Sequence, residues 1–258
     1  MATRTARVPA SLAAYVLHRY DWSESSLILD LFTREQGRVA VAAKGAKRPH
    51  SQLRAVLLPF QRIQVTLGRL ADEEGASEVQ TLRHADWGGG AAMLTGAALF
   101  SGFYLNELLM KLLARHDPHP ALFDAYAATL PALAPGDDVQ GEAALRAFEL
   151  VLLREVGLLP ELDVATLTQQ PVAAGTGYLL QPEAGVAEGR GVDTDLDGAA
   201  LVALEAALSH GHLGALQQAA RAVLPALKVQ LRALLHYHVG TPMLRTRRVM
   251  MDLLNLQT

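Results

Sequence analysis

The spacing of hydrophobic residues changes once along this chain, at Trp87–Gly90. Before that point, short apolar runs alternate with turn-prone residues, and in one of them Ile63, Val65 and Leu67 share a face, as in a half-buried strand. The five runs are Ala13–His18, Ser26–Thr33, Arg38–Ala43, Gln61–Leu67 and Ser77–Arg83. Five short strands at this spacing predict a small closed β-barrel.

After Gly90 the apolar residues recur with helical spacing. The predicted helices cover 94–112, Pro120–Leu133, Gly141–Val156, Gly198–Ser209, Leu213–Tyr237 and Leu244–Leu254. Asp197 is expected to cap one of them, and Pro225 is expected to kink or split another. The segment 158–197 lacks periodicity and predicts an irregular insertion with one hairpin around Tyr178–Gln181.

The fold class is therefore α+β, with a barrel domain at 1–85 and a helical domain at 86–258. Half of the residues are hydrophobic, which is enough to bury a sizeable core. No apolar run reaches the roughly 20 residues of a membrane span, so we expect a cytoplasmic protein with no membrane contact.

Charge is unevenly distributed, although the formal net charge is only −3. Between Arg34 and Arg69, eight basic residues stand against one acid, and from Arg221 onward six stand against one. The residues between His84 and Ala220 carry 17 acids and 5 basic residues. If the two basic regions meet in space, they form one positive face on an otherwise acidic protein.

The first basic region contains a loop without acidic residues, from Gly37 to Arg54. Basic side chains gain free energy by displacing counterions from phosphates, so such a loop suits a polyanion. The candidate phosphate contacts are Arg38, Lys44, Lys47, Arg48 and Arg54, with Trp22 as an exposed base-stacking aromatic and Arg245, Arg247 and Arg248 as a C-terminal cluster. A solvated surface loop and ordinary terminal charge are the alternatives.

No catalytic or cofactor-binding motif is present. The chain has no cysteine, which excludes disulfides, thiolate zinc sites and thiol nucleophiles. His116 and His119 flank Pro118 without a third local ligand, so a turn is favoured over a metal site. We expect a binding protein without metal, cofactor or enzymatic activity; a hydrolase using scattered His and Asp residues is the remote alternative.

Several motifs together carry a family resemblance. They are Tyr15–Val39 (YVLHRYDWSESSLILDLFTREQGRV), Ala43–Lys47 (AKGAK), Leu57–Phe60 (LLPF), Ser101–Leu109 (SGFYLNELL) and Leu145–Leu153 (LRAFELVLL). The chain resembles the bacterial RecO family of recombination mediators, strongly over about 12–157 and more loosely to the end.

The resemblance implies an OB-fold barrel followed by a helical domain. It implies binding of single- and double-stranded DNA, annealing of complementary strands, and contact with single-strand binding protein (SSB) and RecR to help load RecA. Arg146 matches the position expected to contact the acidic SSB tail, and Lys228 is a second candidate. An alternative function is a protein-interaction adaptor with incidental DNA affinity.

The chain departs from the family pattern in one place. Many members carry four zinc-binding cysteines after the segment that matches Pro160–Asp163, and here no cysteine follows. The resemblance therefore implies no zinc in this chain, and the insertion 158–197 must be held by packing or remain loose.

Overall fold

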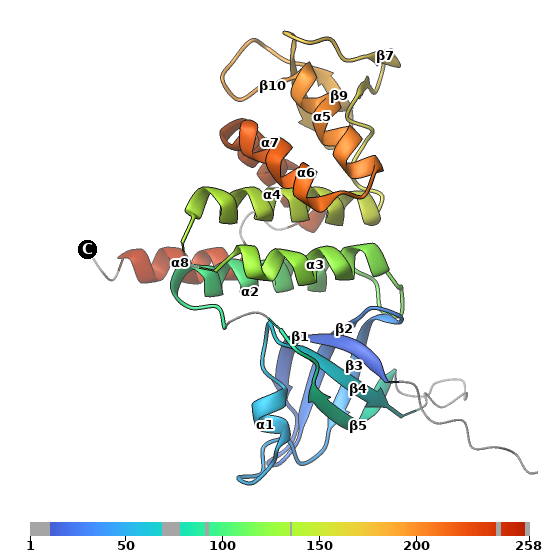
Figure 1. Ribbon diagram of the computed structural model, residues 1–258, viewed down its shortest axis with the longest axis vertical. Helices are drawn as coiled ribbons and strands as arrows, with labels where there is room; N and C mark the ends of the chain where they lie inside the picture. The colour runs from blue at the N-terminus through green and yellow to red at the C-terminus, as the bar shows by residue number, and fades with distance from the viewer. Residues whose placement is uncertain (1–10, 69–77, 91–92, 135, 241–243, 256–258) are drawn as a thin grey trace, which may run out of the picture. The chain divides into compact units, whose positions relative to one another are not determined.

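The computed structural model describes residues 11–68, 78–90, 93–134, 136–240 and 244–255. The chain forms two compact units, one of Met1–Met93 with Leu113–Phe123 and one of Leu94–Leu112 with Asp124–Thr258 (Figure 1). Each unit is described by itself.

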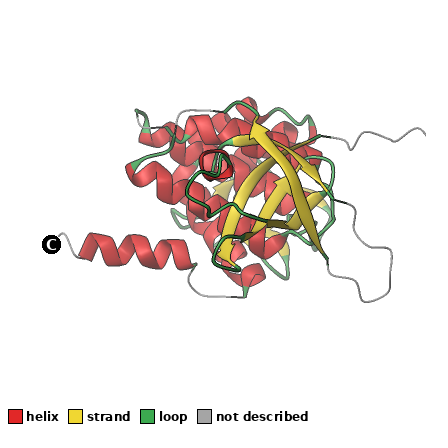
Figure 2. Ribbon diagram, turned by 90° about the horizontal axis from the view of Figure 1, so that it is seen from below, coloured by secondary structure: helices red, strands yellow, loops and turns green. Residues whose placement is uncertain are grey.

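The first unit is a closed barrel of β1 (Leu12–Asp21), β2 (Leu27–Thr33), β3 (Gly37–Ala43), β4 (Arg62–Leu67) and β5 (Val79–Trp87). The strands follow the order β1-β2-β3-β5-β4, and β4 closes on β1. The β3–β5 pair is parallel and the other pairs are antiparallel. This is the arrangement of an OB-fold, as expected from the sequence, and Figure 2 shows the strands curling around a common interior.

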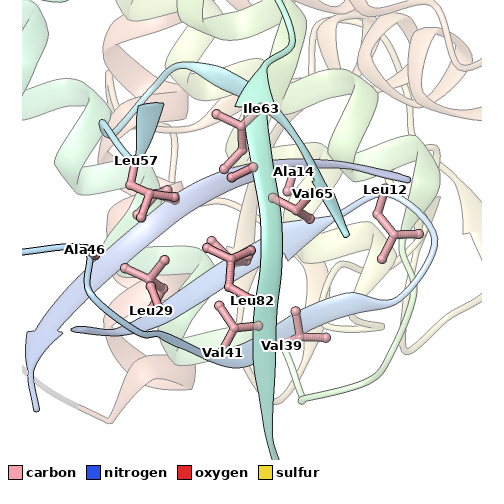
Figure 3. Close-up of a cluster of buried hydrophobic side chains, with 14 residues drawn as sticks. Leu12, Ala14, Leu29, Val39, Val41, Ala46, Leu57, Ile63, Val65 and Leu82 are labelled. Carbon is pink, nitrogen blue, oxygen red and sulfur yellow. The ribbon is translucent and has the colours of Figure 1, made fainter. Parts of the chain in front are cut away.

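Aliphatic and small side chains from all five strands fill the barrel (Figure 3). Ile63 and Val65 on β4 are fully buried and Leu67 packs against the same cluster, which confirms the shared face predicted from their alternation. Leu57 follows the single-turn helix α1 (Leu53–Val56), between β3 and β4, and closes the interior.

The returning segment Leu113–Phe123 covers one outer face of the barrel. Phe123 packs against Tyr15 and Phe32, with ring centroids 5.3 and 5.4 Å apart, respectively. A β-carbon on Gly37, which has φ of +66°, would lie 1.9 Å from the Asp117 carbonyl oxygen, so only glycine permits this close approach.

The second unit is mainly helical. Its helices are α2 (Gly96–Leu112), α3 (Pro120–Ala132, which starts in the first unit), α4 (Asp138–Glu155), α5 (Gly198–Ser209), α6 (Leu213–Ala222), α7 (Leu224–Val239) and α8 (Arg245–Asn255). In this unit α4 packs against α2, α6 and α7, and α8 packs along α2. None of the described helices is long and apolar enough to cross a membrane.

Two predicted helix boundaries are confirmed, and one is corrected. Asp197 accepts a hydrogen bond from the backbone N–H of Ala199 at 2.8 Å and so caps α5. The chain splits between α6 and α7, which places Pro225 in the first turn of α7. The helix predicted from Gly141 starts earlier, at Asp138, because Asp137 caps it by accepting from Gln140 N–H at 2.9 Å.

The insertion 158–197 contains short strands. They are β6 (Val164–Ala165), β7 (Gln170–Pro171), β8 (Gly177–Gln181), β9 (Gly185–Glu188) and β10 (Leu196–Asp197). The hairpin expected around Tyr178–Gln181 is the β8–β9 pair, and β10 pairs with β8 on its other side.

Two buried polar side chains attach the insertion to the helices. Gln230 on α7 accepts from Leu180 N–H at 2.7 Å, and donates to the carbonyls of Tyr178 and Thr194 at 3.1 and 2.6 Å. Glu205 on α5 accepts from Leu162 N–H at 2.9 Å and pairs with Arg154 at 2.6 Å. Hydrogen bonds and packing thus hold this segment.

Candidate nucleic-acid interface

The basic loop between β3 and α1 is built from consecutive tight turns. Arg48 N–H donates to the Gly45 carbonyl at 3.1 Å, and Ser51 N–H donates to the Arg48 carbonyl at 3.0 Å. Gly45 has φ of +74°, a left-handed conformation that suits glycine. The turns leave Lys44 and Arg48 exposed to solvent, and Arg54 is exposed on α1.

Lys47 points back to the turn between β1 and β2. Its ammonium group lies 3.0 Å from Asp21 Oδ1 and donates to the Ser23 carbonyl at 2.9 Å. The backbone N–H of Lys47 also donates to the Ser25 carbonyl at 2.9 Å. These contacts fix the loop beside the turn that carries Trp22, whose side chain is 57% exposed. Lys47 therefore has a structural role as well as a charge.

Arg38 lies on the outer face of β3 and is largely buried. Its side chain is 15% exposed and its Nε lies 4.0 Å from Oδ1 of Asp30, a carboxylate that is 4% exposed. Arg115 approaches the same oxygen at 3.6 Å and lies 3.9 Å from Glu78. Part of the positive charge of Arg38 is thus balanced within the barrel unit.

The sequence did not indicate Arg115 as a site residue. The chain passes through α2 before Arg115 returns to the barrel, where it forms a backbone bridge with Arg38 and His116 N–H donates to the Arg38 carbonyl at 3.0 Å. No local pattern predicts such a return, so only the fold brings these two arginines together.

The aromatic residues of the barrel divide into core and surface groups. Tyr15, Phe32 and Phe60 are buried, whereas Trp22 and Tyr20 are exposed, the latter by 41%. Tyr20 stacks edge-on against His18, with ring centroids 4.4 Å apart. Burial, and then the neighbouring Asp30 carboxylate, raises the pKa of Tyr20, so its hydroxyl stays protonated at neutral pH.

Trp87, at the end of β5, is 67% exposed and was also missed as a site residue. Alternation did not reveal its outward position: the β4–β5 register shifts between Leu82 and His84, and strict alternation from the core-facing Ala85 would place Trp87 on the inner face. An exposed tryptophan offers a flat surface for base stacking.

A groove of about 660 Å³ lies between the basic loop, α1 and the start of β2. Leu27, Leu53, Leu57 and Leu58 supply apolar lining. Three cations also line it, Arg19, Lys47 and Arg54. The remaining lining residues are the acid Asp21 and the small apolar Ala46. The groove belongs entirely to the barrel unit.

The C-terminal cations lie on α8, in the second unit. Arg245 and Arg248 are exposed and Arg247 is partly buried. Glu107 on α2 accepts hydrogen bonds from Arg245 N–H at 2.8 Å and from Thr246 N–H at 2.9 Å. A carboxylate at this position accepts hydrogen bonds from backbone N–H groups of the first turn, which have no partner within the helix. Its negative charge also interacts favourably with the positive end of the helix dipole.

Arg146, the predicted SSB contact, is only 7% exposed. Its Nη2 lies 2.8 Å from Oε1 of the fully buried Glu149, and that oxygen also accepts from the Tyr104 hydroxyl at 2.5 Å. Burial raises the pKa of Glu149, while Arg146 and Tyr104 oppose that shift. The second candidate, Lys228, is more exposed and pairs with Glu142. The partner-binding role of both residues stays a prediction.

Among the described residues, no group of three or more His, Asp or Glu side chains gathers as a metal site. His119 lies 3.3 Å from Asp117, and His84 lies 2.6 Å from Asp86. Each is a two-residue pair within one strand or turn.

The fold and the basic loop define an OB-fold protein with an appended helical domain. Residues 9–86 match the family described as "Recombination protein O N terminal", and residues 93–248 match "Recombination protein O C terminal". The chain belongs to the RecO family.

The similarity to individual relatives extends over nearly the whole chain. A protein of Polaromonas sp. strain JS666 is 52% identical over 93% of this chain and 95% of its own length. The corresponding protein of Polaromonas naphthalenivorans is 54% identical over the same shares. That of Acidovorax ebreus is 51% identical, over 97% of this chain and 99% of its own length. Each of these relatives is named "DNA repair protein RecO".

Proposed function

We propose that this chain is a DNA repair and recombination mediator of the RecF pathway. It binds single- and double-stranded DNA, anneals complementary strands, and acts with RecR to load RecA onto SSB-coated DNA. It does so in the cytoplasm, at the nucleoid, and breaks no covalent bond.

The observation that supports the DNA-binding step best is the exposed cation set of the loop. Lys44 and Arg48 project from one loop of an OB barrel, Arg54 projects from the adjoining helix α1, and Lys47 holds the loop beside the exposed Trp22. Cations that follow a phosphate backbone next to an aromatic side chain are the usual elements of a single-strand-binding surface. Annealing needs such a surface, because backbone contacts leave base edges free to pair.

The test is a salt-dependent DNA titration of Arg48→Gln against Arg190→Gln. Both arginines are exposed, but Arg190 lies in the acidic insertion, so the two variants lose the same charge at different places. We expect Arg48→Gln to reduce the slope of log affinity against log salt by about 0.7 on single strands, the value of one phosphate contact. Equal slopes for both variants and the wild type would remove Arg48 from the interface.

A protein-interaction adaptor remains the second candidate, and the exposed Lys228 of α7 favours it as a contact for an acidic tail. Annealing of naked complementary strands by the purified chain separates the two functions. A mediator of the proposed kind accelerates it, whereas an adaptor leaves the spontaneous rate unchanged.

A further inference from the structure

The groove beside the basic loop combines an apolar lining with a cationic rim. Leu53 and Leu57 of the α1 region pack against the barrel core, and Leu58 adds a further apolar side chain to the lining. Arg19 stands on β1 and donates to the Leu57 carbonyl at 3.4 Å. Arg54 is exposed on α1 itself. The groove therefore presents two arginines around an aliphatic surface.

The rim of the groove keeps a positive charge. Its one acid, Asp21, lies 3.0 Å from the Lys47 ammonium group, so these two charges largely balance each other. Arg19 and Arg54 remain as the cations that a ligand meets. A ligand that fills the groove would pair an anionic group with these arginines and an apolar part with the leucines.

The size and position of the groove indicate which anion it takes. Its volume of about 660 Å³ lies within the range of roughly 300–1,000 Å³ found for small-molecule sites. It adjoins the loop that carries Lys44 and Arg48, and Trp22 directly follows its lining residue Asp21. The groove thus lies next to the cations proposed to contact phosphates.

We propose that the groove receives one unstacked base of single-stranded DNA, with the flanking phosphates held by Arg19 and Arg54. This inference rests on the proposed DNA-binding function and adds a base-dependent contact to it. A duplex cannot occupy the groove without losing a base pair and its stacking. The groove therefore gives this barrel a preference for single strands that charge alone does not supply.

The experiment compares an oligothymidine with an abasic oligonucleotide of the same length, which keeps every phosphate and lacks every base. The protein variants are Leu58→Gln, which makes the groove polar without changing charge, and Arg48→Gln, which removes a cation outside the groove lining. Leu58 is only partly buried, and thermal unfolding checks that Leu58→Gln remains folded.

For the wild type we expect the abasic strand to bind about tenfold more weakly, the effect of one modest base contact. Leu58→Gln should lose the share of this difference that the groove contributes, retain the share from stacking on Trp22, and keep its affinity for the abasic strand. Arg48→Gln should weaken both strands by the same factor. If Leu58→Gln kept the wild-type ratio of its affinities for the oligothymidine and the abasic strand, the assignment of the groove as a base site would be overturned.

A measurement on the wild type alone avoids any question of folding. A photoreactive 4-thiothymidine oligonucleotide should form adducts with residues that line the groove: Arg19, Asp21, Leu27, Ala46, Lys47, Leu53, Arg54, Leu57 or Leu58. Adducts confined to other segments would contradict the proposal. If neither oligonucleotide binds at all, the proposed function itself fails; if both bind equally, only the base site fails.

A competing occupant is an acidic peptide with an apolar side chain. A labelled peptide of that kind, tested with the same variants, gives the opposite pattern if it is the true ligand. Binding of the peptide that Leu58→Gln abolishes, together with equal binding of thymidine and abasic strands, would replace the base with a peptide.

Discussion

Glu107 on α2 holds Thr246 on α8 by two hydrogen bonds, one from the backbone N–H at 2.9 Å and one from the hydroxyl at 2.8 Å. The capping residue of α8 is therefore distant in sequence, and α8 depends on a partner helix for its first turn. The position of the arginines at 245, 247 and 248 depends on the same carboxylate.

Replacing Glu107 with alanine should loosen α8. Loss of a cap costs about 1 kcal/mol, and removal of the carboxylate also removes a favourable interaction with the helix dipole. We expect faster hydrogen exchange in 245–255 and little change in 138–155. Glu107→Gln keeps an acceptor and should retain part of the protection; identical exchange in all three proteins would contradict the capping role.

Removing Arg146 should destabilise the helical unit strongly at neutral pH. The Glu149 carboxylate is fully buried, so without Arg146 it loses its paired cation and keeps only the Tyr104 hydrogen bond and the more distant Arg232, at a cost of up to about 3–5 kcal/mol. Chemical denaturation of Arg146→Ala measures this loss. Lys228→Ala removes an exposed cation from the same unit and should change stability little.

The same pair predicts a pH dependence. The folded-state pKa of Glu149 is raised, so the folded state binds the proton more tightly than the unfolded one. The contribution of Glu149 to stability is complete below its unfolded pKa of about 4.3 and declines as pH rises from there towards the folded pKa. In Arg146→Ala the pKa rises further, so the deficit against wild type should shrink as pH is lowered. A deficit independent of pH would exclude Glu149 as its cause.

Gln230 should hold the insertion 158–197 against α7. Gln230→Ala leaves Leu180 N–H and the carbonyls of Tyr178 and Thr194 without this partner, and a buried unsatisfied group costs about 1–3 kcal/mol. We expect a lower Tm and protease cleavage within 158–197. Gln218→Ala, on an exposed helix face, is the matched control, and a metal chelator should leave the wild-type Tm unchanged.

Asp30 should restrain the DNA affinity of the barrel. It lies within 4.0 Å of Arg38 and 3.6 Å of Arg115, so Asp30→Asn leaves both guanidinium groups less neutralised. We expect tighter DNA binding and a salt slope steeper by about one phosphate contact. Glu78→Gln removes an exposed partner of Arg115 and should have a smaller effect. Weaker binding by Asp30→Asn would show that the carboxylate positions the arginines instead.

The sequence predicted the strands and helices better than it predicted which side chains contact one another. Strands such as β4 follow from alternation, and the break before Pro225 follows from the missing proline N–H, because both depend on nearby residues. Arg146 and Glu149 lie three residues apart on α4, but the contact between Glu149 and Tyr104 of α2 joins distant residues, and the pairing of Arg115 with Asp30 depends on the path of the chain through α2. Such contacts between distant residues have no periodic signal.

The hydrogen bond between His116 and Arg38 has a practical consequence for dissecting this protein. The barrel is not encoded by one continuous stretch of the gene, because its outer aromatic face is completed by Phe123. A fragment cut after Met93 would leave Phe32 exposed and Asp30 without Arg115. A shortened protein intended to carry the barrel alone therefore needs 113–123 joined back to it, for example through a designed linker in place of α2.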